Sequence, residues 1–135
     1  MIVIDTSIAI GWFVDTQRSD VGERALDLAA DAGWIVPFHF GLEFASSLRG
    51  LERRNKIAAA KTDAALLSIS KMSPVVDLTT QHEPQTKLLP IARRFDITLY
   101  DAAYLELALR TKLPLATRDK ELAKAAVKAG VALFK

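Results

Sequence analysis

Cysteine is absent from this 135-residue sequence, so disulfide bonds and thiolate metal sites are excluded, and any metal must be bound by oxygen or imidazole ligands. No apolar run approaches the roughly 18 residues needed to cross a bilayer, and the first residues lack the basic segment of a secretory signal. The formal net charge is only +2, too small for nucleic-acid binding by charge alone. We therefore expect a cytoplasmic protein without a membrane association.

The composition that remains is that of a globular domain. Half of the residues are hydrophobic and 25% are charged, a balance typical of folded proteins. A chain of this length buries roughly two thirds of its unfolded surface and needs no covalent cross-link to support a core. No internal repeat and no linker composition interrupts the sequence, so we predict one domain over residues 1–135.

Short apolar segments alternate with segments of helical periodicity. Strands are predicted at residues 2–4, 34–36, 74–77, 113–116 and 131–134. Helices are predicted at residues 8–12, 22–32, 38–55, 62–71, 83–95, 101–111 and 119–129, with Pro90 expected to disturb the fifth of them. Because parallel strands need crossover helices, this alternation predicts an α/β fold with a mostly parallel sheet of about five strands, covered on both faces.

Several acidic residues stand where such a sheet places its ligand sites, beyond the carboxyl ends of the strands. Asp5 ends the first strand, and Asp119 closely follows the strand at 113–116. Asp101 opens a helix, where the helix dipole favours an anion. Glu43 lies in an otherwise apolar helical face and needs a partner there. Taken singly, each acid is also explained by helix capping or by a solvent-exposed position.

Four carboxylates in one pocket would repel one another and raise their pKa values unless a multivalent cation neutralised them. All-oxygen ligands suit Mg²⁺ or Mn²⁺, and the chemistry that follows is hydrolysis of a phosphodiester by metal-activated water, with a carboxylate helping to remove the proton. An alternative is a zinc site at His39 and Glu43, which are spaced i, i+4. No third soft ligand is evident for it.

The residues that carry these features also form a recognisable pattern. The matching pieces are Val3-Ile4-Asp5-Thr6-Ser7, Glu43 in the helix after the second strand, Leu99-Tyr100-Asp101-Ala102-Ala103-Tyr104, and Leu115-Ala116-Thr117-Arg118-Asp119. In their order and spacing the sequence resembles the PIN-domain family, and within it the compact VapC-type toxins, over essentially its full length. The resemblance implies a three-layer α/β/α sandwich, an Mg²⁺ or Mn²⁺ site and endoribonuclease activity.

Carried over residue by residue, the resemblance also implies roles for individual side chains. Thr117 matches a hydroxyl that orients the last acid or a metal water, and Thr6 or Ser7 would support the same site. The pattern departs at Ser46, where many relatives have asparagine. The residues matching the metal-binding acids are Asp5, Glu43, Asp101 and Asp119.

VapC-type toxins are usually homodimers restrained by a small antitoxin whose tail lies in an apolar groove, so the resemblance implies both partners beside the RNA substrate. Aromatic residues are candidates for lining that groove or for ordinary core packing. Arg49, Arg53 and Arg54 are candidates for contacting the RNA backbone or for a solvated helix face. A housekeeping RNA-processing nuclease and a catalytically silent RNA-binding domain are the alternative functions. The aromatic candidates are Trp12, Phe13, Phe38, Phe40 and Phe44.

Overall fold

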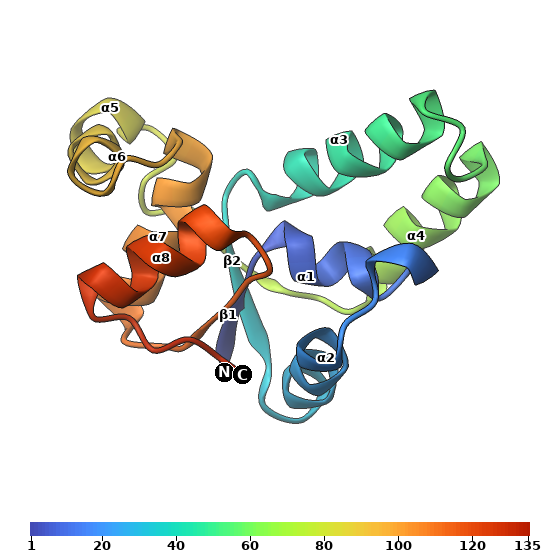
Figure 1. The fold of residues 1–135 in the computed structure, drawn as a ribbon, viewed down its shortest axis with the longest axis horizontal. Helices are drawn as coiled ribbons and strands as arrows, with labels where there is room; N and C mark the ends of the chain where they lie inside the picture. Colours follow the sequence, from blue (N-terminus) through green and yellow to red (C-terminus); the bar gives the residue numbers. More distant parts are fainter.

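The computed structural model describes residues 1–135 and is organised around a parallel sheet (Figure 1). Its four strands run in the order β3-β2-β1-β4, and every pairing is parallel. This confirms the predicted α/β class. The strands are β1 (Ile2–Ile4), β2 (Trp34–Pro37), β3 (Val75–Asp77) and β4 (Leu115–Ala116).

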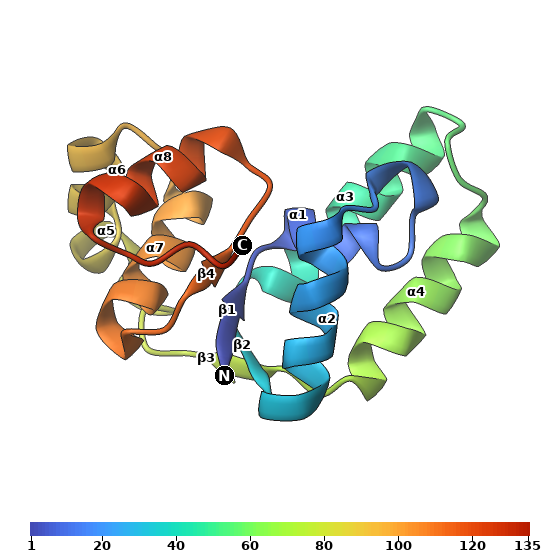
Figure 2. The same ribbon diagram turned by 60° about the horizontal axis from the view of Figure 1, so that its bottom comes forward.

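Helices cover both faces of the sheet, which gives the three layers of a sandwich (Figures 1 and 2). Helices α1 to α4 and the short 3₁₀ helix η1 form one side, where α2 packs on β1 and β4, and helices α5 to α8 form the other, where α7 packs on β1, β2 and β4. The first group is α1 (Thr6–Gly11), η1 (Asp15–Gln17), α2 (Asp20–Ala32), α3 (Phe40–Arg53) and α4 (Ala59–Lys71). The second group is α5 (Pro84–Lys87), α6 (Leu89–Phe95), α7 (Leu99–Thr111) and α8 (Lys120–Ala129).

Two predicted elements differ from the structure. The fifth strand, at residues 131–134, is reduced to a single parallel bridge between Leu133 and Leu115, because β4 is only two residues long and offers little edge to pair with. The helix predicted at residues 83–95 is divided into α5 and α6. Pro90 lies in the first turn of α6, where its missing N–H costs no helical hydrogen bond.

The core is centred on β1, whose three residues are completely buried, as expected for a central parallel strand covered on both faces. Phe40 and Phe44 belong to the same core cluster, and Trp12 and Phe13 pack against it from partly buried positions. Phe38 packs against a smaller cluster under α6 and α7. Core packing therefore accounts for all five aromatic candidates. No helix has the length and apolar character of a membrane span.

Candidate active site

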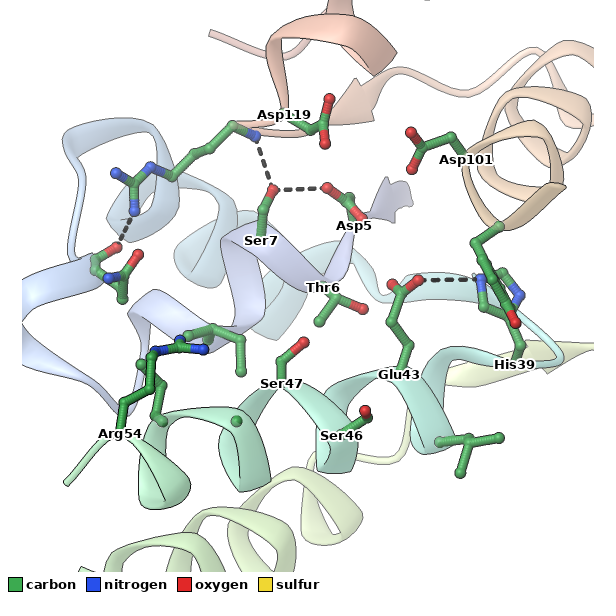
Figure 3. Close-up of a pocket in the computed structure, with 17 residues that line it drawn as sticks. Asp5, Thr6, Ser7, His39, Glu43, Ser46, Ser47, Arg54, Asp101 and Asp119 are labelled. Atoms are coloured by element: carbon green, nitrogen blue, oxygen red, sulfur yellow. Dashed lines mark hydrogen bonds and ion pairs between the residues drawn. The ribbon is translucent and has the colours of Figure 1, made fainter. Parts of the chain in front are cut away.

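The four predicted acids lie in one pocket (Figure 3). The pocket has a volume of about 880 Å³ and opens beyond the carboxyl ends of β1 and β4. Asp5 follows β1, Glu43 lies in the first turn of α3, Asp101 lies in the first turn of α7, and Asp119 is the N-cap of α8. Segments far apart in the sequence thus bring four carboxylates to one edge of the sheet, as the strand-end pattern predicts.

Asp5 is the most enclosed of the four, with 5% of its surface exposed. Its Oδ2 atom accepts hydrogen bonds from the Ser7 hydroxyl at 2.6 Å and the Thr117 hydroxyl at 2.7 Å. Burial is the main influence on the pKa of Asp5 and raises it, the two hydroxyl groups lower it, and the negative charges of Glu43 and Asp119 raise it further, so that the net direction is upward. The two hydroxyl groups hold the carboxylate in a fixed orientation.

Thr117 contacts Asp5 through its side chain and Asp119 through the backbone. Its hydroxyl donates to Asp5 and accepts a hydrogen bond from the backbone N–H of Asp119 at 3.0 Å. The carboxylate that it orients directly is therefore that of Asp5, and it touches Asp119 only through the backbone. The expectation for Ser7 agrees with the structure, because Ser7 donates to Asp5 and accepts from the backbone N–H of Arg118 at 2.9 Å.

Glu43 is held by a hydroxyl group that the sequence did not single out. The phenol of Tyr104, which is fully buried, donates to Glu43 Oε1 at 3.0 Å and lies 2.9 Å from the Thr6 hydroxyl. His39 Nε2 lies 3.6 Å from Glu43 Oε2. Burial alone would raise the pKa of Glu43, but the interactions with His39, Thr6 and Tyr104 outweigh it and lower that pKa. Glu43 is thus kept ionised.

Burial and the neighbouring acids both act on Asp101. Its pKa is raised from 3.8 to about 7, first by burial and then by the negative charges of Asp119, Asp5 and Glu43. Figure 3 shows the carboxylates of Asp101 and Asp119 pointing toward each other across the pocket. Asp119 also caps α8, since its Oδ1 accepts from the backbone N–H of Leu122 at 3.0 Å. Asp119 therefore both caps a helix and lines the pocket.

The donor set fits a hard divalent cation, although the side chains do not form a closed ligand cage. All four acids offer oxygen, and Mg²⁺ commonly binds one or two carboxylates while keeping several waters. No three acidic or histidine side chains lie close enough to share one ion directly. The zinc alternative has no third ligand, and His39 Nε2 is buried without a hydrogen-bond partner. The mutual repulsion at Asp101 is what a cation would relieve.

The three candidate arginines divide by position. Arg54 lines the pocket, whereas Arg49 and Arg53 do not. Arg49 forms an ion pair with Glu52 at 2.9 Å, and Arg53 is exposed on the surface. Arg118, which the sequence reasoning missed, also lines the pocket. None of the five aromatic candidates lines the pocket.

These features define a three-layer α/β/α protein with an acidic pocket at the carboxyl ends of its parallel strands. The family model of the PIN domain matches residues 2–128. The chain therefore belongs to the PIN-domain family, and its similarity to a VapC protein places it among the VapC-type members.

Similar proteins support the assignment to the PIN-domain family. The chain is 32% identical over 125 residues to "Ribonuclease VapC3" from two strains of Mycobacterium tuberculosis, and the match covers 92% of this chain and 86% of the relative. The crystal structure of PAE2754 from Pyrobaculum aerophilum has a TM-score of 0.68 at 20% identity, covering 90% of this chain and 82% of that one. The second similarity concerns the fold alone.

Proposed function

We propose that this protein is a ribonuclease of the VapC type that uses Mg²⁺ or Mn²⁺ to cleave cellular RNA endonucleolytically, as the toxin of a toxin–antitoxin pair. The observation that carries the proposal is the convergence of four carboxylates, from four separate elements, on one pocket. Charge repulsion contributes to a pKa of about 7 at Asp101. A fold retains such repulsion at a cost in stability, which a site for a cation explains. The name of the similar ribonuclease supports the choice of RNA as substrate.

The acids of the pocket would have different roles in binding the cation and in proton transfer. A bound divalent cation supplies charge neutralisation at the scissile phosphate and activation of water. Asp5 and Glu43, fixed by hydroxyl groups, would hold the cation in place. Asp101 and Asp119 face the same space from the other side of the pocket and would complete the binding of the cation or accept a proton from the attacking water.

Cleavage of RNA by the purified protein tests the proposal. Total RNA is incubated with Mg²⁺, with Mn²⁺ or with EDTA, and the wild type is compared with Asp5→Asn and Asp101→Asn. We expect cleavage only with a divalent cation, and a loss of at least about 100-fold in rate in either variant, because each substitution removes a charged oxygen ligand or proton acceptor. The length distribution of the RNA is read on a denaturing gel.

Asp20→Asn is a matched control. Asp20 lies in the first turn of α2, as Asp101 lies in the first turn of α7, but it is exposed and does not line the pocket. Its loss removes the same helix-dipole interaction without touching the pocket. Full activity of Asp5→Asn and Asp101→Asn would show that the site is wrong. Intact RNA under all metal conditions, with RNA still bound, would indicate a catalytically silent member of the family.

The partners belong to the same proposal. We propose that the protein acts in the cytoplasm as a homodimer and is inhibited by an antitoxin. Expression in a host cell should arrest growth, and co-expression of a neighbouring antitoxin gene should relieve the arrest. Asp101→Asn should not be toxic. Growth unaffected by the active wild type would favour a housekeeping role in RNA processing, and light scattering of the purified protein tests the dimer.

A further inference from the structure

One face of α3 forms a continuous wall of the pocket. Glu43, Ser46, Ser47, Gly50 and Arg54 all line it, and their spacing of three and four residues places them along one side of the helix. Figure 3 shows the labelled members of this row following one another along the ribbon. Small side chains lie in the middle of the row, and the two ends carry opposite charges. Arg54 follows the last residue of α3, and its guanidinium lies beside Gly50, which is seven positions or roughly 10 Å along the helix axis from Glu43.

Arg54 and Arg118 line the pocket, and neither forms an ion pair. Arg54 follows the last residue of α3, and Arg118 reaches Gln17, whose carbonyl lies against Gly11 at the end of α1, the helix that packs on α3. We call this part of the pocket its arginine end. Of the arginines outside the pocket, Arg18, Arg49 and Arg110 each bind a carboxylate within 4.0 Å, and the others form no ion pair. Neither Arg54 nor Arg118 therefore has a carboxylate within 4.0 Å.

Arg118 is nonetheless held in place. Its Nη1 atom donates to the backbone carbonyl of Gln17, another residue of the pocket wall, and its backbone N–H donates to Ser7. A guanidinium has five N–H donors in a rigid fork that matches the oxygens of a phosphate. One hydrogen bond to Gln17 leaves the others free for a ligand.

The charges of the pocket favour a phosphate at this end. Four carboxylates and two guanidinium groups line it, so one divalent cation at the acids cancels the net negative charge of the ionised pocket. With the cation in place the acidic end no longer repels a polyanion. The arginine end keeps its two positive charges.

We propose that Arg54 and Arg118 bind a flanking phosphate of a single-stranded RNA whose scissile phosphate lies at the acidic end, with the strand following the Ser46–Gly50 wall between them. This inference rests on the proposed function. Asp5 is 5% exposed at the end of β1, and a flexible single strand reaches such a recessed group, whereas a stiff A-form duplex presents its phosphates on a convex surface.

The binding of a labelled RNA oligonucleotide tests the inference. The probe is a fluorescein-labelled oligouridylate of about ten nucleotides, within the range of single-strand sites. Its affinity is measured by fluorescence anisotropy with Mg²⁺ at several salt concentrations, on the Asp101→Asn background so that the probe stays intact. Arg54→Ala and Arg118→Ala should each weaken binding roughly threefold to tenfold at low salt. Each should also reduce the slope of log K against log salt by about 0.7, the value for one phosphate contact of a single strand.

Arg53→Ala is the matched control, because Arg53 is the exposed neighbour of Arg54 on the same helix and does not line the pocket. It should change the affinity less than twofold. An equal loss in Arg53→Ala would overturn the inference in favour of unspecific surface charge. Equal affinity for a duplex of the same length would overturn the single-strand requirement. Unchanged RNA binding together with weaker binding of an oligoglutamate peptide would assign the two arginines to a protein partner instead.

Failure of this inference and failure of the proposed function give different results. If wild-type protein cleaves RNA and both arginine variants bind the oligouridylate normally, only the arginine subsite is wrong. If wild-type protein neither cleaves nor binds RNA with Mg²⁺ or Mn²⁺, the ribonuclease proposal is wrong, and so is the phosphate subsite at Arg54 and Arg118. Circular dichroism of each variant checks that the fold is retained.

Discussion

Replacing Asp101 by asparagine should stabilise the protein in EDTA at pH 8. At about 1.4 kcal/mol per pKa unit, the rise of the Asp101 pKa from 3.8 to about 7 corresponds to roughly 4 kcal/mol of unfavourable interaction of the ionised group. Asp101 is only half-buried, so solvent screening reduces this to about 1–2 kcal/mol. Loss of a negative charge from the first turn of α7 costs about 0.3–1 kcal/mol in the opposite direction. A net gain of about 1 kcal/mol remains.

The gain should depend on pH in a definite direction. Between pH 3.8 and about 7 the unfolded chain loses the Asp101 proton while the folded protein keeps it. The folded state therefore binds more protons, and the contribution of Asp101 to stability falls as the pH rises through this window. Below pH 4 the group is protonated in both states and the repulsion vanishes. The advantage of Asp101→Asn should thus be greatest above pH 7 and disappear toward pH 4.

Thermal unfolding followed by circular dichroism measures this effect. A net gain of about 1 kcal/mol corresponds to roughly 3–6 °C in Tm for a chain of this size. Asp20→Asn, which also removes a charge from the first turn of a helix, should show no stabilisation at either pH. Saturating Mn²⁺ should reverse the order, since the wild type gains binding energy that Asp101→Asn lacks. An Asp101→Asn variant that is less stable than wild type at pH 8 in EDTA would refute the argument from charge repulsion.

Three other substitutions test the supports of the site and the fold. Tyr104→Phe removes the donor to Glu43 and should weaken Mn²⁺ binding by roughly tenfold in calorimetry, and an unchanged affinity would contradict a positioning role. Thr117→Val keeps the shape but leaves Asp5 with one donor fewer, so unfolding at pH 8 should become easier by about 1–3 kcal/mol, with a smaller change at acid pH where Asp5 is protonated. Arg110→Ala breaks the paired hydrogen bonds from α7 to the end of β3 and should cost about 1 kcal/mol at low salt, and an equal cost at high salt would argue against an ionic contribution.

The positions of Asp5 and Asp119 could be predicted because the sequence indicates where the preceding strands end. Asp5 follows a β-branched run, and Asp119 follows a short apolar run, so the rule for parallel sheets brings both to one edge. The run at residues 131–134 has the same character but does not form a strand. The strand beside it, β4, has only two residues, so it offers few backbone groups for pairing. The β propensity of residues 131–134 does not include the length of the neighbouring strand.

Two other residues of the site, Tyr104 and Arg118, could not be predicted in the same way. Tyr104 lies between Ala103 and Leu105 on a buried helix, so its sequence context indicates core packing, and only the structure shows its phenol against Glu43. Arg118 lies between Thr117 and Asp119 in the loop after β4, where no periodicity fixes the direction of a side chain. Both depend on where a long side chain ends, which is decided by tertiary contacts.

The hydrogen bonds around the acids explain how the fold holds this cluster of charge. Asp5 receives two hydroxyl donors, Glu43 receives a buried phenol, and Asp119 receives the N–H of Leu122. The donors to Glu43 lower its pKa, and the donors to Asp5 offset part of the rise that burial causes there. At Asp101, burial and then the charges of Asp119, Asp5 and Glu43 raise the pKa to about 7. The geometry set by β1, α3 and α8 therefore does not depend on a cation. A cation binding to the pocket near neutral pH must displace the proton of Asp101, which couples the affinity for the cation to pH.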